Sequence, residues 1–187
     1  MALKNKNLLF VSTALGLQAA ILVLLNAFIP KMVGMDAMWI AFQAWAVYFV
    51  AGCTPIGGLK AWLGYLSGIV ASIAIIETMG VPGISSLPSV GGMNVVMAVA
   101  VFIVVIPAIM TENVKNMVPA LFIGSGAFFG LWTIIHGNPE LMKSIGDGKV
   151  AKYIFATRVE LVYCLVGQIF GMITVFWRGK YEASLAK

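Results

Sequence analysis

The sequence has 187 residues, of which 61% are hydrophobic and 10% are charged, and its formal net charge at pH 7 is +5. Soluble domains carry about 25% charged residues, so this composition excludes a soluble globular protein and indicates a chain covered mostly by lipid. The basic residues stand singly at the ends of apolar runs, which argues against nucleic-acid binding and is typical of residues that set membrane topology.

The length of the chain suits a single transmembrane domain over residues 1–187, with an all-α fold of six transmembrane helices. The first apolar run, residues 8–29, exceeds the roughly 7–15 residues of a signal-peptide core, so we expect an uncleaved helix that stops at Pro30. Within this run, Gln18 and Asn26 predict hydrogen bonds to other helices, and pore lining is the alternative.

The next apolar stretch, residues 37–79, is too long for one span and suits two, which we expect at 37–53 and 59–78. A break rich in glycine and proline at 54–60 separates them. Irregular backbone at membrane depth is tolerated only where it is buried in protein or lines a water-filled cavity. The sequence therefore predicts a candidate solute path or packing site made of Tyr48, Cys53, Thr54, Pro55, Gly57, Gly58, Lys60 and Gly64.

Two functions of this break are open. The backbone carbonyls and amides of residues 55–58 could face a small solute, or the glycines could serve only a tight turn between packed helices. Lys60 could attract an anion, or it could anchor the chain at the lipid headgroups.

Three further spans are expected at residues 93–110, 117–135 and 153–177. Faces of small residues predict close helix packing in three of the six helices. Their members are Gly57, Ala61, Gly64 and Gly68 in the third helix, Gly124, Gly126 and Gly130 in the fifth, and Gly167 and Gly171 in the sixth.

Few charged or titratable side chains accompany these spans. We expect Glu77 and His136 to be exposed at helix ends. Arg158 and Glu160 lie early in the last helix, where they are costly unless they pair or reach the interface.

The distribution of lysine and arginine predicts the orientation. With six spans and both termini inside, seven basic residues lie on the cytoplasmic side and four lie outside, so we expect an N-in/C-in topology. This topology places the 54–60 break on the cytoplasmic side.

No pattern for catalysis or metal binding is present in the sequence. There is one histidine, and the two cysteines, Cys53 and Cys164, stand in apolar segments without a CxxC pair, so we expect two buried structural thiols. Neither nucleotide-binding glycine motif occurs. We therefore expect no enzyme activity, no cofactor and no metal.

The hypothesis that these features favour is a channel or facilitator for a small neutral or weakly polar solute, built as a homo-oligomer in the lipid bilayer. The first alternative is a proton-coupled secondary transporter that uses Glu77 or the Arg158/Glu160 pair. The second alternative is a membrane scaffold subunit that transports nothing.

Two stretches resemble a known family of bacterial inner-membrane proteins, the one described as domain of unknown function 1097. The first stretch is Tyr48-Phe49 followed by Cys53 and Pro55-x-Gly57-Gly58-Leu59-Lys60, and the second is Val118-Pro119-x-x-Phe122-Ile123-Gly124. The resemblance implies a multi-pass protein of the inner membrane. It implies no established activity and no catalytic residues.

Overall fold

The computed structural model describes residues 2–90, 94–110 and 117–185, and helices make up most of them. In chain order these helices are α1 (Ala2–Leu25), α2 (Ile29–Val33), α3 (Met38–Val50), α4 (Pro55–Met79), α5 (Val95–Met110), α6 (Val118–Gly137), α7 (Pro139–Ile145) and α8 (Lys149–Leu185). The prediction of an all-α fold is confirmed.

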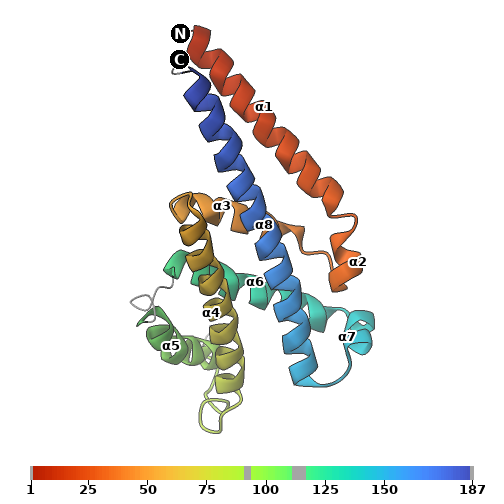
Figure 1. Ribbon diagram of the computed structural model, residues 1–187. Coiled ribbons are helices and arrows are strands. Elements are labelled where there is room, and N and C mark those ends of the chain that lie inside the picture. The colour runs from red at the N-terminus through yellow and green to blue at the C-terminus, as the bar shows by residue number, and fades with distance from the viewer. Residues whose placement is uncertain (1, 91–93, 111–116, 186–187) are drawn as a thin grey trace.

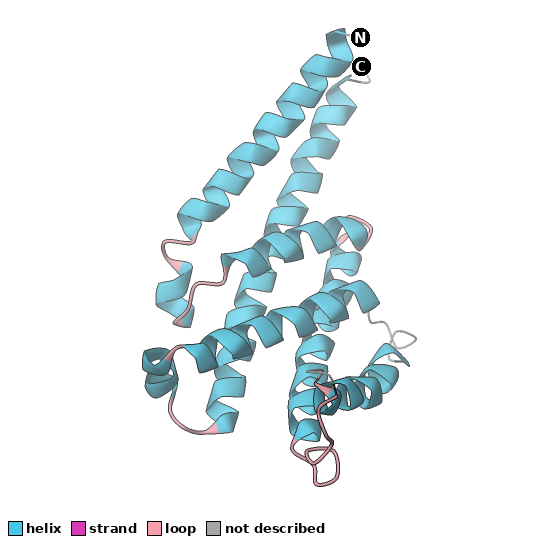
Figure 2. Ribbon diagram, turned by 180° about the vertical axis from the view of Figure 1, so that it is seen from behind, coloured by secondary structure: helices cyan, strands magenta, loops and turns pink. Residues whose placement is uncertain are grey.

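The helices cross one another rather than running in one direction. Helices α3 and α6 form one layer that crosses a second layer made of α4 and α8 (Figures 1 and 2). The main contacts join α4 to α6 and α3 to α8, while α5 packs on α4. Helix α1 runs beside the far half of α8, so the start of α1 and the end of α8 lie together at one end of the molecule (Figure 1).

Four helical segments are long and apolar enough to cross a membrane, namely Leu8–Leu25, Pro55–Met79, Val118–Gly137 and Lys149–Leu185. Helices α3 and α5, with 13 and 16 residues, are shorter than the roughly 20 residues that a span needs. Six spans therefore stay a prediction. Helix α8 has 37 residues and, at a rise of about 1.5 Å per residue, exceeds the roughly 30 Å hydrocarbon thickness.

Glycines allow the close approach of helices where the two layers cross. A Cβ atom added at Gly124 on α6 would lie 2.6 Å from the carbonyl oxygen of Tyr65 on α4, a contact that real Cβ atoms do not make. At the other crossing, a Cβ added at Gly167 on α8 would overlap the carbonyl oxygen of Ala41 on α3. The prediction of packing is therefore confirmed for Gly124 and for Gly167.

The small face of the predicted third helix is also buried. Its members Gly57, Ala61, Gly64 and Gly68 all lie inside α4. Gly126 is different: it is exposed, and an added Cβ would meet nothing within 4 Å. The prediction of packing at Gly126 was wrong within this chain. Gly126 is two residues, or more than half a helical turn, from Gly124, so it does not lie on the face of α6 that contacts α4.

Several helix boundaries differ from those predicted. Pro30 does not end a helix but lies in the first turn of α2. In a first turn the missing N–H of proline costs nothing, because that amide would have no partner within the helix. Helix α4 begins at Pro55 rather than at 59, because the Thr54 hydroxyl oxygen accepts a hydrogen bond from the Gly57 amide at 3.0 Å and caps the first turn. Helix α8 begins at Lys149 rather than at 153. The predicted start of a helix at 93 lies outside the described residues, and α5 begins at Val95.

Candidate functional site

The turn between α3 and α4 is short and uses left-handed backbone. Gly52 has a φ of 89° and Cys53 a φ of 58°, which is an uncommon value for a residue other than glycine. This conformation directs Cys53 outward, so its side chain is exposed and the prediction of a buried thiol there was wrong. Cys164, on α8, is fully buried as predicted.

The backbone of the predicted break is engaged within the protein. The Gly57 amide donates to the Thr54 hydroxyl, and the Gly58 amide donates to the Thr54 carbonyl oxygen at 2.9 Å. Pro55 has no amide hydrogen, and residues 55–58 belong to the first turn of α4. Of the two functions left open for this break, the tight turn between packed helices fits these contacts, because the Gly57 and Gly58 amides are not free to face a solute.

The two glycines of this turn allow contacts that a larger residue would prevent. A Cβ at Gly57 would overlap the carbonyl oxygen of Ala51, which ends α3. A Cβ at Gly58 would lie 2.9 Å from Cε2 of Tyr48 and 3.1 Å from Oε1 of Gln168. The turn is thus a tight packing joint between α3, α4 and α8.

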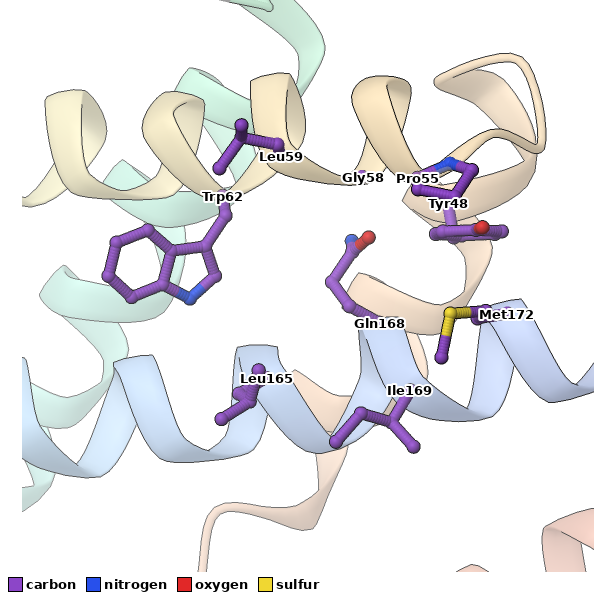
Figure 3. A pocket seen from close by; sticks show the side chains of 9 residues that line it. All are labelled: Tyr48, Pro55, Gly58, Leu59, Trp62, Leu165, Gln168, Ile169 and Met172. Atoms are coloured by element: carbon purple, nitrogen blue, oxygen red, sulfur yellow. The ribbon is translucent and has the colours of Figure 1, made fainter.

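A cavity of about 340 Å³ lies next to this joint, between the first turns of α4 and the middle of α8 (Figure 3). Its volume falls in the range of about 300–1,000 Å³ that is typical of small-molecule sites. The lining residues are Tyr48, Pro55, Gly58, Leu59, Trp62, Leu165, Gln168, Ile169 and Met172. The lining is therefore mainly apolar and carries no ionic side chain.

Two buried polar atoms beside this cavity have no hydrogen-bond partner among the described residues. One is the Oε1 atom of Gln168 and the other is the indole Nε1 of Trp62. Figure 3 shows both side chains between the two helices, with the Gln168 amide directed toward Gly58 and the Trp62 nitrogen directed toward α8. An acceptor and a donor left free in an apolar lining are the groups that a bound molecule with both functions would satisfy.

The orientation of the Gln168 amide follows from its other contacts. Its Nε2 donates to the carbonyl oxygen of Ala44 at 3.0 Å and to the hydroxyl oxygen of Tyr65 at 2.8 Å. A carbonyl can only accept a hydrogen bond, so the nitrogen must face Ala44 and the oxygen is left free. Gln168 therefore joins α3, α4 and α8 while keeping one acceptor available.

Sequence reasoning missed Trp62 and Gln168. The signal for Gln168 was a lone amide within the apolar run 153–177, and Trp62 gave no signal beyond its place next to the glycine-rich turn. Of the predicted residues, Tyr48, Pro55 and Gly58 line the cavity. Lys60 is exposed and Gly64 is buried inside α4, and neither belongs to the lining.

Glu77 is engaged at the surface, far along α4 from the cavity. One of its carboxylate oxygens lies 2.9 Å from the Lys149 ammonium and accepts a hydrogen bond from the Tyr153 hydroxyl at 2.7 Å. Its side chain is 54% exposed, which confirms the predicted exposure. His136 is also exposed, as predicted.

Arg158 and Glu160 do not pair. The Arg158 guanidinium donates to the carbonyl oxygen of Val33 at 2.9 Å and lies over the ring of Phe155. Glu160 is fully buried, and neither of its carboxyl oxygens has a hydrogen-bond partner among the described residues. Positions two apart on a helix point in different directions, so the structure separates the two charges that the sequence placed together.

The polar residues of the predicted first span, Gln18 in α1 and Asn26 just after its end, join this part of the chain to α8. The Gln18 amide oxygen accepts a hydrogen bond from the Trp177 indole at 2.9 Å, and the Asn26 amide oxygen accepts one from the Tyr163 hydroxyl at 2.9 Å. The predicted hydrogen bonds to another helix are confirmed for both residues.

Taken with the composition, these features define an all-helical protein with several helices long and apolar enough for a membrane and an uncharged cavity between two of them. No group of three or more metal-binding side chains occurs within the described parts of the chain. The chain belongs to the family described as "Protein of unknown function (DUF1097)", which it matches over residues 16–177. No curated protein and no solved structure matches the sequence.

Proposed function

We propose that this chain is a multi-pass protein of the bacterial inner membrane that forms a channel or facilitator for a small neutral or weakly polar solute. The observation that carries the proposal is the cavity of about 340 Å³ with its free acceptor on Gln168 and free donor on Trp62. The six-span, N-in/C-in topology is part of the proposal and is supported by the distribution of basic residues.

The chemistry of the lining supports an uncharged solute. A charged molecule placed in an apolar site without an opposite charge loses hydration that nothing replaces. A small amide or alcohol needs only one donor and one acceptor, which Trp62 and Gln168 supply. The proposed solute class is therefore small molecules with amide or hydroxyl groups.

The proposal includes a homo-oligomer. The side chains of Leu59, Leu165 and Met172 at the rim of the cavity are 60%, 51% and 47% exposed. Only 6% of the apolar segment Leu8–Leu25 is buried within the chain. In a membrane, lipid or further copies must cover these surfaces, and a second copy would enclose the cavity from the side.

The test is solute flux into liposomes that contain the purified protein. A neutral amide such as urea should enter faster than into empty liposomes, and charged analogues should not. Because a hydrogen bond contributes about 0.5–1.5 kcal/mol, Trp62→Phe and Gln168→Leu should each slow this flux about two- to tenfold. Ser67→Ala is the matched control, since the Ser67 hydroxyl on the same helix bonds only to the Leu63 carbonyl.

Two results would count against the proposal. Absence of flux above that of empty liposomes would favour the scaffold subunit, which should instead co-purify with a fixed partner. Flux that Trp62→Phe and Gln168→Leu leave unchanged would show that the solute does not use this cavity.

A second candidate function, proton-coupled secondary transport, is favoured by one observation, the buried and unpartnered carboxyl of Glu160. The other candidate groups, Glu77 and Arg158, are engaged in the contacts described above. Under this alternative, uptake driven by a pH gradient should be lost in Glu160→Gln. Flux that does not depend on the pH gradient in either the wild type or Glu160→Gln would reject this alternative.

A further inference from the structure

Glu160 is an unusual residue for the interior of this protein. It lies on α8, is 0% exposed, and is flanked by Val159, Tyr163 and Cys164, which are also 0% exposed. Both carboxyl oxygens lack a hydrogen-bond partner in the described residues. An isolated carboxylate buried in this way would carry a large desolvation penalty, so the position favours a carboxyl that carries a proton.

Few titratable groups surround Glu160. The other fully buried titratable side chains of α4 and α8 are Tyr65, Tyr163 and Cys164, none of which is a cation. Helix α3 contains no aspartate, glutamate, lysine or arginine, and the only such group or histidine on α6 is His136 at its exposed end. The charged groups of α2 and α4, which are Lys31, Lys60 and Glu77, are exposed. Arg158, two residues from Glu160, donates to the Val33 carbonyl oxygen instead, so no described cation forms an ion pair with Glu160.

A metal ion is a poor alternative occupant. Hard cations take about six oxygen ligands, whereas Glu160 has no second carboxylate beside it, and no cluster of three metal-binding side chains occurs in the described segments. A single proton satisfies the carboxyl without any further ligand.

Tyr65 contacts the face of α8 that also carries Glu160, because Glu160, Cys164 and Gln168 recur at intervals of four residues along this helix. The Tyr65 hydroxyl oxygen accepts the hydrogen bond from Gln168 Nε2 at 2.8 Å, and no acceptor for its own proton occurs among the described residues. The Tyr65 hydroxyl therefore has a proton that it can donate to an acceptor on this face of α8. A movement of Tyr65 toward Glu160 would change its hydrogen bond to Gln168, whose other end lines the cavity.

We propose that Glu160 is a proton-binding site, linked through Tyr65 and Gln168 to the cavity between α4 and α8. The carboxyl holds a proton in the conformation described here. Release of this proton is accompanied by a rearrangement of Tyr65 and Gln168 that alters the cavity. The link to the cavity rests on the proposed function, whereas proton binding by Glu160 does not.

The proton site is tested without any solute. Hydrophobic carbodiimides react with protonated carboxyl groups in apolar surroundings, so dicyclohexylcarbodiimide should label the full-length protein in lipid nanodiscs at Glu160. Mass spectrometry of peptides locates the label in the wild type and needs no variant. Glu160→Gln should lose the label, while Glu77→Gln, which removes an exposed and ion-paired carboxylate, should keep it.

Infrared spectroscopy provides an independent measurement. The carbonyl band of a protonated carboxyl at neutral pH should be present in the wild type and in Glu77→Gln and lost in Glu160→Gln. Absence of both the label and the band from the wild type would overturn the proposal, as would a band that persists in Glu160→Gln.

The link to the cavity is tested by the pH dependence of solute flux. Wild-type flux should change with pH, and Glu160→Gln should remove this dependence. Tyr65→Phe, which deletes the connecting hydroxyl, should also remove it while retaining the carbodiimide label. A pH dependence that survives in Tyr65→Phe would overturn the link. Because the label is measured without solute, failure of the proposed transport and failure of the proton site give different results.

Discussion

The close packing of α4 against α6 can be tested with two glycines of α6, of which one lies at the crossing and the other does not. A methyl group added at Gly124 would lie 2.6 Å from the carbonyl oxygen of Tyr65 and 2.7 Å from its Cα. These are backbone atoms, which cannot turn aside as a flexible side chain does. Gly124→Ala therefore requires α4 and α6 to move apart, which loses contacts along the whole crossing.

Gly126→Ala is the matched control, because an added Cβ there meets nothing within 4 Å. Alanine is intrinsically better in a helix than glycine by about 1 kcal/mol, and this gain applies to both variants. Overpacking in a core costs about 1–3 kcal/mol, and only Gly124→Ala carries that cost. We therefore expect Gly124→Ala to be less stable than Gly126→Ala by about 1–3 kcal/mol.

The assay is unfolding of each purified variant in mixed micelles with rising fractions of sodium dodecyl sulfate, followed by fluorescence of the five tryptophans. Gly124→Ala should unfold at a lower fraction of dodecyl sulfate than the wild type, and Gly126→Ala at the same or a higher fraction. Equal midpoints for the two variants would refute the close approach of α4 and α6 at Gly124. A loss of stability in Gly126→Ala alone would instead indicate that Gly126 packs against another copy of the chain.

Further predictions concern the α3–α4 turn and the surface ion pair. Gly57→Leu and Gly58→Leu should lower the yield of folded protein on size-exclusion chromatography, because the new side chains would overlap Ala51 and Tyr48. Lys60→Gln changes an exposed side chain and should behave as the wild type. Equal yields for all three variants would show that the turn tolerates larger side chains. Glu77→Gln should leave the thermal unfolding curve in detergent almost unchanged at physiological salt, because exposed ion pairs contribute little; a large loss of stability would show that this contact is buried in the membrane-embedded protein.

Much of the secondary structure could be predicted from the sequence alone. In a nonpolar environment, the backbone N–H and C=O groups of an apolar run of 16 or more residues can form hydrogen bonds only with each other. Such runs therefore form helices whatever their neighbours are. The faces of small residues likewise predicted close packing, and Gly124 and Gly68 lie at the α4–α6 crossing. The order and separation of the motifs around Pro55 and Pro119 were sufficient to predict the family.

The candidate site could be predicted only in part. The sequence indicated the turn before α4, and Tyr48, Pro55 and Gly58 do line the cavity. It could not indicate Trp62 and Gln168 as a pair, because they lie far apart in the chain and line the same cavity only where α4 passes α8. It also left open whether the glycine amides face a solute, and the structure shows that the cap at Thr54 engages the Gly57 amide within the helix.

The sequence by itself determined that this chain is helical, apolar enough for a membrane and poor in groups for catalysis, because these properties depend on composition and local periodicity. Only the tertiary structure decided which polar groups are free. Arg158 and Glu160 are two residues apart, yet Arg158 reaches the carbonyl oxygen of Val33, whereas Glu160 is enclosed with no hydrogen-bond partner in the described part of the chain. That difference depends on which neighbour each face of α8 meets, and the crossing of the two helix layers sets those neighbours.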